Sequence, residues 1–446
     1  MRHPRRGMLI AGLVAVAVLL PLGAVAHGDA ARSEARHGSD PRRVGYFIQW
    51  GIYGRAFFVK NLDTSGAAAR LTHVNYAFGN VAPDAAGDVT CASGDVWADY
   101  QRPVGADESV DGVGDVWGEP LNGNLGQLLK LKARHPNLRV MMSLGGWTWS
   151  KYFSDAALTA ASRAAFVASC VDMFIKGNLP SLGPGESGGP GSAAGVFDGI
   201  DLDWEWPASE GNAGNVIRPE DRPNFTLLLA EFRRQLDEYG RQAGRRYELT
   251  AFLPAAPAKI EAGFEPGIFR YLDFATVQGY DFHGTWETVT NHQSAIREPA
   301  GAPISPDFSI DRAVRAWIAN GAPRGKLVIG IPYYGQGWTG VSGGGDGLFQ
   351  PSAGPATGTW GPGNEDYKKL TTLAGNGFAV HRDLRAGHAW LFDGTTLWTF
   401  DDPLVVLQKT LYIRHQRLGG AMVWELSGDD ANATLTKVIH FGLTVP

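Results

Sequence analysis

Three carboxylates occupy alternate positions in one short stretch of the chain. Asp201, Asp203 and Glu205 are separated by single apolar residues within the segment DGIDLDWEW, which begins at Asp198. In an extended strand such alternate residues project from one face, so the three carboxyl groups lie close together. Mutual repulsion and partial burial raise the pKa of at least one member of such a group. The spacing therefore predicts a carboxyl group that stays protonated near neutral pH and serves as a general acid.

Two other interpretations of this acidic stretch are weaker. A solvated acidic strand would carry polar residues on its second face, but that face is apolar and holds Ile200, Leu202, Trp204 and Trp206. A calcium or magnesium site also uses clustered carboxylates, yet the turn-forming glycine and the further oxygen ligands of a calcium loop are missing. An extended strand also wraps a cation poorly. We therefore expect a covered strand, no metal ion and no cofactor.

The N-terminal region has the features of a secretory signal peptide. Basic residues precede an apolar run that ends at Ala24-Val25-Ala26. This order predicts a signal peptide over residues 1–26, cleavage after Ala26, and a secreted, extracellular protein. An uncleaved membrane anchor is the alternative, because the run is nearly long enough to span a bilayer, but its proline and its small-residue end favour cleavage. Residues 27–42 are polar without periodicity and predict a flexible lead-in.

The charge balance argues against binding of nucleic acid. The chain has 446 residues and a formal net charge of −5, which becomes −8 once the three arginines of the signal peptide are removed. A mildly acidic chain without a basic run does not attract a phosphate backbone. We expect no nucleic acid, no membrane contact after cleavage, and a monomer.

Two cysteines, Cys91 and Cys170, are present in the chain. An oxidising destination permits a disulfide between them, and two separate buried thiols are the alternative. Neither a Cys-x-x-Cys nor a His-Glu-x-x-His motif occurs, so the sequence offers no zinc-ligand spacing.

Short β-rich runs recur along the chain and alternate with helix-like segments. Such alternation predicts parallel strands joined by crossover helices, and eight runs predict closure into a (β/α)8 TIM barrel, an α/β fold. The C-terminal ends of the strands face the active site in such barrels, and Glu205 lies at that end of the fourth run. The runs are residues 44–48, 73–78, 139–144, 199–206, 248–253, 274–281, 327–333 and 420–426, and the helix-like segments include 125–134, 160–175, 222–239, 310–320 and 403–417.

Two segments are too long for plain crossovers. Residues 81–124 form a Gly- and Asp-rich excursion after the second strand, and residues 335–400 lie between the seventh strand and the last helix. Loops of this length usually form the lids or walls of a site. The second segment has enough aromatic residues for a small subdomain with its own core, namely Trp338, Trp360, Tyr367, Trp390 and Trp398. Without a linker or an internal repeat, residues 43–446 are predicted to form one catalytic domain.

Four motifs together resemble one enzyme family. The segment DGIDLDWE at 198–205 is similar to the Asp-Gly-x-Asp-x-Asp-x-Glu signature of family 18 glycoside hydrolases, the chitinases. SLGGW at 143–147, QGYD at 278–281 and VWE at 423–425 resemble the family motifs of strands three, six and eight. The four motifs stand in family order, and the resemblance runs from about residue 44 to residue 441. It implies that the segment at about 335–400 is an α+β insertion subdomain that deepens the cleft.

The resemblance assigns a separate task to each carboxylate. In the family the last carboxyl group protonates the glycosidic oxygen, which makes Glu205 the acid. The 2-acetamido carbonyl of the substrate attacks the anomeric carbon in place of an enzyme nucleophile. Asp203 is then expected to bond the acetamido nitrogen and stabilise the charge that forms there, while Asp201 shares a proton with Asp203. Tyr280 is expected to hold the acetamido oxygen, and Asp281 to contact the same sugar.

The same resemblance predicts substrate contacts around these groups. Trp424 corresponds to the tryptophan under the distorted sugar, with ordinary core packing as the alternative. Gln278 stands where many family members have Met, and Gln336 stands where they have Arg, so a neutral amide replaces a cationic donor near Gln336. Further candidates for the floor and walls of the cleft, for each of which core packing is an alternative, are Trp147, Tyr46, Phe78 and Tyr334.

The main hypothesis is a secreted chitinase. It would hydrolyse chitin or chitooligosaccharides, the β-1,4-linked polymers of N-acetylglucosamine, by substrate-assisted catalysis with retention, and so contribute to chitin degradation. The alternative within the same fold is an endo-β-N-acetylglucosaminidase that acts on N-glycans. An alternative of a different class is a non-catalytic, lectin-like chitin-binding protein, which the presence of Glu205 disfavours.

Overall fold

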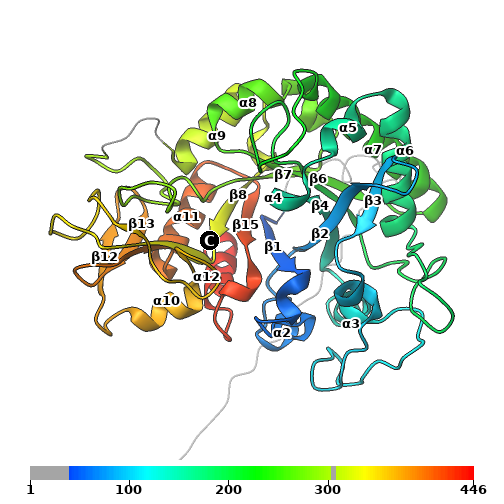
Figure 1. Cartoon of the computed structure of the whole chain (residues 1–446), viewed down its shortest axis with the longest axis horizontal. Helices are drawn as coiled ribbons and strands as arrows, with labels where there is room; N and C mark the ends of the chain where they lie inside the picture. Colours follow the sequence, from blue (N-terminus) through cyan, green and yellow to red (C-terminus); the bar gives the residue numbers. More distant parts are fainter. Residues whose placement is uncertain (1–39, 303–307, 446) are drawn as a thin grey trace, which may run out of the picture. The chain divides into compact units, whose positions relative to one another are not determined.

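A closed barrel of eight parallel strands forms the body of the protein (Figure 1). The computed structural model describes residues 40–302 and 308–445. The barrel strands are Arg42–Ile48 (β1), His73–Pro83 (β2), Arg139–Gly145 (β4), Gly199–Asp203 (β5), Glu248–Leu253 (β6), Phe274–Val277 (β7), Leu327–Pro332 (β8) and Gly420–Trp424 (β15). Because β1 pairs in parallel with both β2 and β15, the sheet closes on itself, which confirms the predicted TIM barrel.

Four barrel strands end earlier than the sequence predicts: β8 and β15 by one and two residues, and β5 and β7 by three and four. The fourth run continues to Trp206 in the prediction but β5 ends at Asp203, and the sixth continues to Asp281 but β7 ends at Val277. The strand alternation stops at these ends, so it no longer decides which way the following side chains point. Glu205 and Tyr280 therefore lie on loops just beyond the strands.

Helices and short helical turns cover the outside of the barrel and its two ends. α11 begins where Asp402 Oδ1 accepts a hydrogen bond from Val405 N at 2.9 Å, with Pro403 at its first position. The helix predicted over 160–175 is α6 followed by the π-helical turn η3. The α-helices are Val59–Thr64 (α2), Gly123–Arg134 (α3), Gly146–Trp149 (α4), Phe153–Ala157 (α5), Ala160–Cys170 (α6), Asp221–Ala243 (α7), Pro257–Gly263 (α8), Ile310–Ala319 (α9), Tyr367–Leu373 (α10), Pro403–His415 (α11) and Thr434–Thr444 (α12). The shorter turns are Gln49–Ile52 (η1), Trp97–Gln101 (η2), Val171–Ile175 (η3), Pro266–Arg270 (η4), Arg324–Lys326 (η5) and Leu426–Gly428 (η6).

The second excursion folds as an α+β insertion between β8 and α11. Its antiparallel sheet consists of Tyr334–Thr339 (β9), Gly354–Pro355 (β10), Asn364–Asp366 (β11), Ala379–Asp383 (β12), His388–Phe392 (β13) and Leu397–Phe400 (β14), with α10 beside it. The insertion appears in yellow and orange in Figure 1, next to β8 and β15. Trp338, Trp390 and Leu397 form part of its own apolar cluster. The predicted subdomain is confirmed, although its first strand begins at Tyr334.

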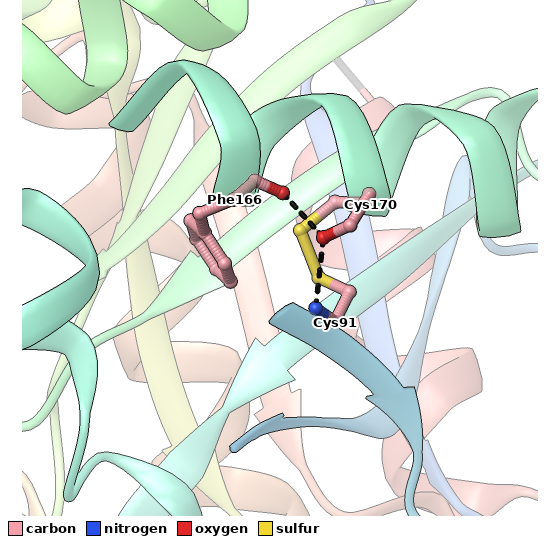
Figure 2. Close-up of a disulfide and its surroundings, with 4 residues drawn as sticks. Cys91, Phe166 and Cys170 are labelled. Carbon is pink, nitrogen blue, oxygen red and sulfur yellow. Dashed lines mark hydrogen bonds between the residues drawn. A yellow bond between two sulfur atoms is a disulfide. The ribbon is translucent and has the colours of Figure 1, made fainter. Parts of the chain in front are cut away.

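The first excursion is tied to the outer helices by a disulfide. It contains Val89–Ser93 (β3), which pairs antiparallel with the extended end of β2. Cys91 on β3 is bonded to Cys170 at the end of α6, 79 residues further along the chain (Figure 2). Beside the bond, Cys91 N donates to Ser169 Oγ at 3.0 Å, and Ser169 Oγ donates to the carbonyl of Phe166 at 2.7 Å. The paired cysteines therefore hold the excursion against α6.

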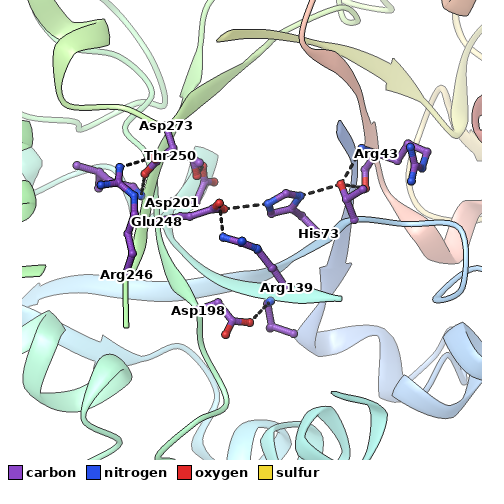
Figure 3. Close-up of polar contacts among 12 residues, drawn as sticks. Arg43, His73, Arg139, Asp198, Asp201, Arg246, Glu248, Thr250 and Asp273 are labelled. Carbon is purple, nitrogen blue, oxygen red and sulfur yellow. Dashed lines mark hydrogen bonds and ion pairs between the residues drawn. The ribbon is translucent and has the colours of Figure 1, made fainter. Parts of the chain in front are cut away.

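An ion-pair network closes the N-terminal end of the barrel (Figure 3). Glu248, the first residue of β6, contacts Arg139, the first residue of β4, and lies 2.9 Å from Nε2 of His73, the first residue of β2. Burial raises the pKa of Glu248, but the bonds from His73 and Arg139 outweigh it, and the pKa lies below its usual value. The network stabilises the end of the barrel that faces away from the predicted active site.

The predicted signal peptide, residues 1–26, lies outside the described residues and stays a prediction. The same holds for most of the predicted lead-in at 27–42, although Arg42 is the first residue of β1. Within residues 40–302 and 308–445, no helix has both the length and the apolar character needed to cross a bilayer.

Loss of the disulfide should lower stability without changing the fold. The bond closes a loop of 79 residues, and removing such a crosslink gives the unfolded chain more conformational freedom. We expect the double variant Cys91→Ser/Cys170→Ser to lose about 2–4 kcal/mol of unfolding free energy in urea titrations. Ser169→Ala, which removes the two neighbouring hydrogen bonds but keeps the crosslink, serves as the control. If the double variant keeps the urea midpoint and slope of the wild type, the disulfide does not stabilise the fold as expected.

Candidate active site

A cavity of about 870 Å³ opens at the C-terminal ends of the barrel strands. Gly145 at the end of β4, Asp203 at the end of β5 and Trp424 at the end of β15 all line it. Most of the residues predicted from the motifs line the cavity, namely Asp203, Glu205, Tyr280, Asp281, Gln278, Trp424, Trp147, Tyr46 and Phe78. The structure thus brings together segments that are up to 378 residues apart in the chain, from Tyr46 to Trp424.

Asp201 lies beneath this cavity and is completely buried. In the sheet register, Ser143 on β4 and Thr250 on β6 stand level with it. Its carboxylate accepts hydrogen bonds from Thr250 Oγ1 at 2.6 Å, from Ser143 Oγ at 2.8 Å and from the Tyr46 hydroxyl at 2.9 Å; the Thr250 contact is visible in Figure 3. Burial raises the pKa of Asp201, and the three hydrogen bonds oppose that rise. The side chain is therefore fixed in position by donors from three strands.

Asp203 is 3% exposed and differs from Asp201 in its hydrogen bonding. Among the described residues, its Oδ1 atom is buried without a hydrogen-bond partner. Burial and the neighbouring carboxyl groups of Glu205 and Asp201 raise the pKa of Asp203 well above its usual value. Burying a carboxyl oxygen without a hydrogen bond costs free energy. A donor group that enters the cavity could bond this atom and offset that cost.

Glu205 lies at the cavity wall, with its backbone held on both sides. Its N–H donates to Ser150 Oγ at 2.9 Å, and its carbonyl accepts from Asn215 Nδ2 at 2.9 Å. Burial raises the pKa of the carboxyl group to about 8; the Lys259 ammonium lowers it, and the Asp281 carboxyl raises it. At neutral pH most Glu205 side chains therefore carry the proton that a general acid needs.

Tyr280 and Asp281 also line the cavity. The Tyr280 hydroxyl is buried, and the contact recorded for it within the described chain is to the weak acceptor Met422 Sδ, at 4.0 Å. Asp281 Oδ1 accepts from the Tyr334 hydroxyl at 2.7 Å and from Gln336 Nε2 at 3.0 Å. Both donors belong to β9, so the first strand of the insertion orients this carboxylate. Tyr334 does not itself line the cavity, and Gln336 bonds a protein group.

Aromatic rings form the floor of the cavity around Trp424. The Trp424 ring stacks on Phe78, with centroids 5.7 Å apart and planes at 21°, and lies 5.2 Å from the Tyr46 ring. Phe78 stacks in turn on Trp50, at 6.2 Å and 28°. Trp147, which also lines the cavity, is 51% exposed. Flat apolar rings of this kind match the apolar faces of pyranose sugars.

Sequence reasoning missed several residues of this site. Thr250 could have been found from the alignment of predicted strands, because it stands level with Asp201. Lys259 on α8 and Trp286 beyond β7 also line the cavity, and no motif pointed to them. Trp206 was predicted on the covered face of the acidic strand, but it lines the cavity because β5 has already ended at Asp203.

Several other tryptophans do not line the cavity. Trp97 and Trp117 are 46% and 57% exposed and do not line the cavity. Of the tryptophans in the insertion, Trp338, Trp390 and Trp398 are buried, whereas Trp360 is 37% exposed. Within residues 40–302 and 308–445, no group of three or more His, Cys, Asp and Glu side chains is placed to hold a metal ion.

The motifs, the barrel and the carboxylate geometry agree with one family. The family model described as Glycosyl hydrolases family 18 matches residues 42–429. The chain belongs to this family. The match includes all eight barrel strands, the insertion and the four motifs, and it confirms the resemblance seen in the sequence.

Proteins named as chitinases are similar to this chain over most of its length. Chitinase C of Streptomyces lividans is 39% identical over 398 residues, which are 87% of this chain and 58% of that protein. Chitinase A1 of Niallia circulans is 35% identical over 444 residues, which are 90% of this chain and 59% of that protein. The chain spans about three-fifths of the length of these curated relatives. Among solved structures, the catalytic domain of the psychrophilic chitinase B from Arthrobacter TAD20 is 46% identical with a TM-score of 0.86, covering 91% of this chain and 96% of that one.

The raised pKa of Glu205 predicts a pH-dependent effect of Glu205→Gln on stability. The folded state keeps the proton up to about pH 8, whereas the unfolded state releases it near 4.5. Between these values the folded wild type binds more protons, so its unfolding free energy falls as the pH rises. Glutamine does not titrate, and the variant should therefore gain stability relative to wild type from pH 5 to pH 8.5 in urea titrations.

The control for this titration is Glu210→Gln, which makes the same chemical change at an exposed position. A stability difference between Glu205→Gln and wild type that is the same at both pH values would mean that Glu205 is not a proton-holding group.

Proposed function

We propose that this family 18 protein is a chitinase that hydrolyses β-1,4-linked N-acetylglucosamine polymers with retention, by substrate-assisted catalysis. The observation that carries the proposal is the buried Oδ1 atom of Asp203, which has no hydrogen-bond partner among the described residues. Asp203 lines the cavity together with Glu205 and Tyr280. A substrate that brings its own N–H donor into the cavity would satisfy this atom. The 2-acetamido group of N-acetylglucosamine has such a donor.

Glu205 acts as the general acid in this proposal. Its raised pKa keeps it protonated at neutral pH, and it lies beside the cavity with a fixed backbone. As the glycosidic bond breaks, the proton passes from the Glu205 carboxyl to the leaving oxygen. The resulting carboxylate then accepts a proton from the water that opens the intermediate.

Asp203 and Tyr280 hold the acetamido group for attack on the anomeric carbon. Asp203 accepts a hydrogen bond from the acetamido nitrogen and stabilises the positive charge that develops there as the oxazolinium ring forms. The Tyr280 hydroxyl, which has a weak acceptor in Met422, donates to the acetamido oxygen. Asp201 stays fixed beneath, and its charge adds to the rise in the pKa of Asp203. In this proposal the two carboxyl groups share a proton.

The rest of the cavity favours a chain of sugars. The stacked rings of Trp424, Phe78 and Trp50 extend the floor to one side, and Trp147 and Trp286 stand exposed on the walls. Asp281, oriented by the insertion, contacts the sugar above Trp424. With the signal peptide predicted from its sequence, the protein would act outside the cell as a monomer and contribute to chitin degradation.

Hydrolysis assays on two substrates test this proposal. We expect release of short products from chitin oligomers and no release from a high-mannose glycoprotein, because the open aromatic floor suits a linear polymer. Activity on the glycoprotein alone would instead support an endo-β-N-acetylglucosaminidase, and binding without hydrolysis would support the lectin-like alternative.

Glu205→Gln should lower kcat on the oligomers by about 10²–10⁴-fold with little change in binding, because only the proton donor is lost. The control is again Glu210→Gln, with wild-type rates expected. Near-wild-type activity of Glu205→Gln would show that another group supplies the proton.

A further inference from the structure

Phe78, whose ring stacks on two tryptophans in the cavity floor, stands at an irregularity in β2. In the register between β2 and β4, Ala77 pairs with Ser143. The next pair is Gly79 with Leu144, so Phe78 is an extra residue without a partner on β4. A β-bulge of this kind takes one residue out of the hydrogen-bond ladder and re-aims its side chain. The Phe78 ring lines the cavity, and its backbone N–H needs an acceptor from outside the pairing with β4.

Gln49 supplies that acceptor. β1 ends at Ile48, which stands level with Ala77 on β2, and Gln49 is the next residue. Its Oε1 atom accepts a hydrogen bond from Phe78 N at 2.7 Å, and the residue is 1% exposed. A buried backbone N–H that lacks a partner costs free energy. The Gln49 side chain therefore fixes the backbone of Phe78 at the bulge.

Asn124 in turn holds the backbone of Gln49. Asn124 lies in the first turn of α3 and is 4% exposed, and its Nδ2 donates to the carbonyl of Gln49 at 3.2 Å. The same Nδ2 donates to the Tyr76 hydroxyl at 3.1 Å, which donates to Asp99 Oδ1 at 2.6 Å. Asp99 belongs to η2 in the first excursion. Consecutive hydrogen bonds therefore connect the excursion to the residue that fixes Phe78.

The second ring of this part of the floor also depends on Gln49. Trp50 follows Gln49 directly in η1, lines the cavity, and stacks on Phe78 with ring centroids 6.2 Å apart. The Phe78 ring also packs closely on Gly146, where an added β-carbon would lie 2.6 Å from a ring atom. Gln49 itself does not line the cavity. One buried amide behind the floor thus holds both stacked rings.

We propose that Gln49 is a positioning residue for binding of the sugar chain, because its hydrogen bond to Phe78 keeps the Trp50 and Phe78 rings in the orientation that the chain meets. This inference rests on the proposed function. Gln49 acts through the two rings and not on the reacting atoms. Its loss should therefore weaken binding and leave the proton transfer from Glu205 unchanged.

Gln49→Met tests this bond, because methionine has a similar length but offers only a weak sulfur acceptor to Phe78 N. We expect KM for chitohexaose to rise about three- to tenfold with kcat unchanged, as for one misplaced aromatic contact. Calorimetric titration in a Glu205→Gln background, which prevents turnover, should show the same loss of affinity. Gln49→Glu keeps an oxygen acceptor and should recover most of the wild-type affinity.

Gln127→Met is the matched control. Gln127 is 2% exposed, and its Oε1 accepts from the backbone N of Val110 at 2.8 Å, which is a bond of the same kind. Neither of these two residues lines the cavity, so KM and kcat should equal those of wild type. Urea titration reports whether each variant is folded. If Gln49→Met does not fold, Gln49→Asn, whose amide is one methylene further from Phe78 N, is measured in its place with the same expectation.

A double-mutant cycle shows whether Gln49 acts through Phe78. Phe78→Ala removes the ring that Gln49 is proposed to position. In that background, Gln49→Met should raise KM by much less than it does in wild type. Fully additive effects of the two substitutions on KM would contradict the positioning role.

The outcomes distinguish this inference from the proposed function. If wild type hydrolyses the hexamer and Gln49→Met keeps the wild-type KM, the positioning role is wrong and the chitinase proposal stands. A lower kcat at unchanged KM would also contradict the role, because it would indicate loss of folded or catalytically competent enzyme. If wild type hydrolyses no chitin oligomer, the chitinase proposal itself fails.

Discussion

The active site depends on one buried carboxylate whose hydrogen-bond donors all come from barrel strands. Asp201 accepts hydrogen bonds from Thr250, Ser143 and Tyr46, which come from β6, β4 and β1. These donors offset the cost of placing a carboxylate at the centre of a closed sheet. Burial and the neighbouring Glu205 raise the pKa of Asp203, and the fixed Asp201 adds to the rise because a carboxyl group two residues later cannot move away from it. The strand register, which fixes Asp201 beside its donors, therefore also keeps the carboxyl groups close together at the cleft.

Carboxyl groups at the two ends of the barrel differ in their pairing and in the direction of their pKa shifts. At the N-terminal end the carboxylate of Glu248 is paired with Arg139 and His73, and its pKa is lowered. At the C-terminal end one Asp203 oxygen has no hydrogen-bond partner in the part of the chain that the structure describes, and burial raises the pKa of Glu205 to about 8. Pairing stabilises the scaffold, whereas the unpaired and protonated groups are available to a substrate.

Much of the fold and of the catalytic centre could be predicted from the sequence, for identifiable reasons. Eight β-rich runs that alternate with helices imply a barrel, and the spacing of Asp201, Asp203 and Glu205 implies one site. The side on which Trp206 lies could not be predicted, because alternation ends with β5 at Asp203. The exposure of Trp360 and the position of Lys259 depend on how loops and the insertion pack, and the pairing of Cys91 depends on a distance in space. Local patterns do not determine such long-range contacts.

The central claim is that the substrate supplies the nucleophile and that the three carboxylates have different tasks. Proton NMR of the first product released from a chitin oligomer tests this claim most directly. Attack by the acetamido group and then by water inverts the anomeric carbon twice, so the first product should be the β anomer. An α anomer as the first product would mean a single displacement by water, and it would contradict the roles given to Asp203 and Tyr280.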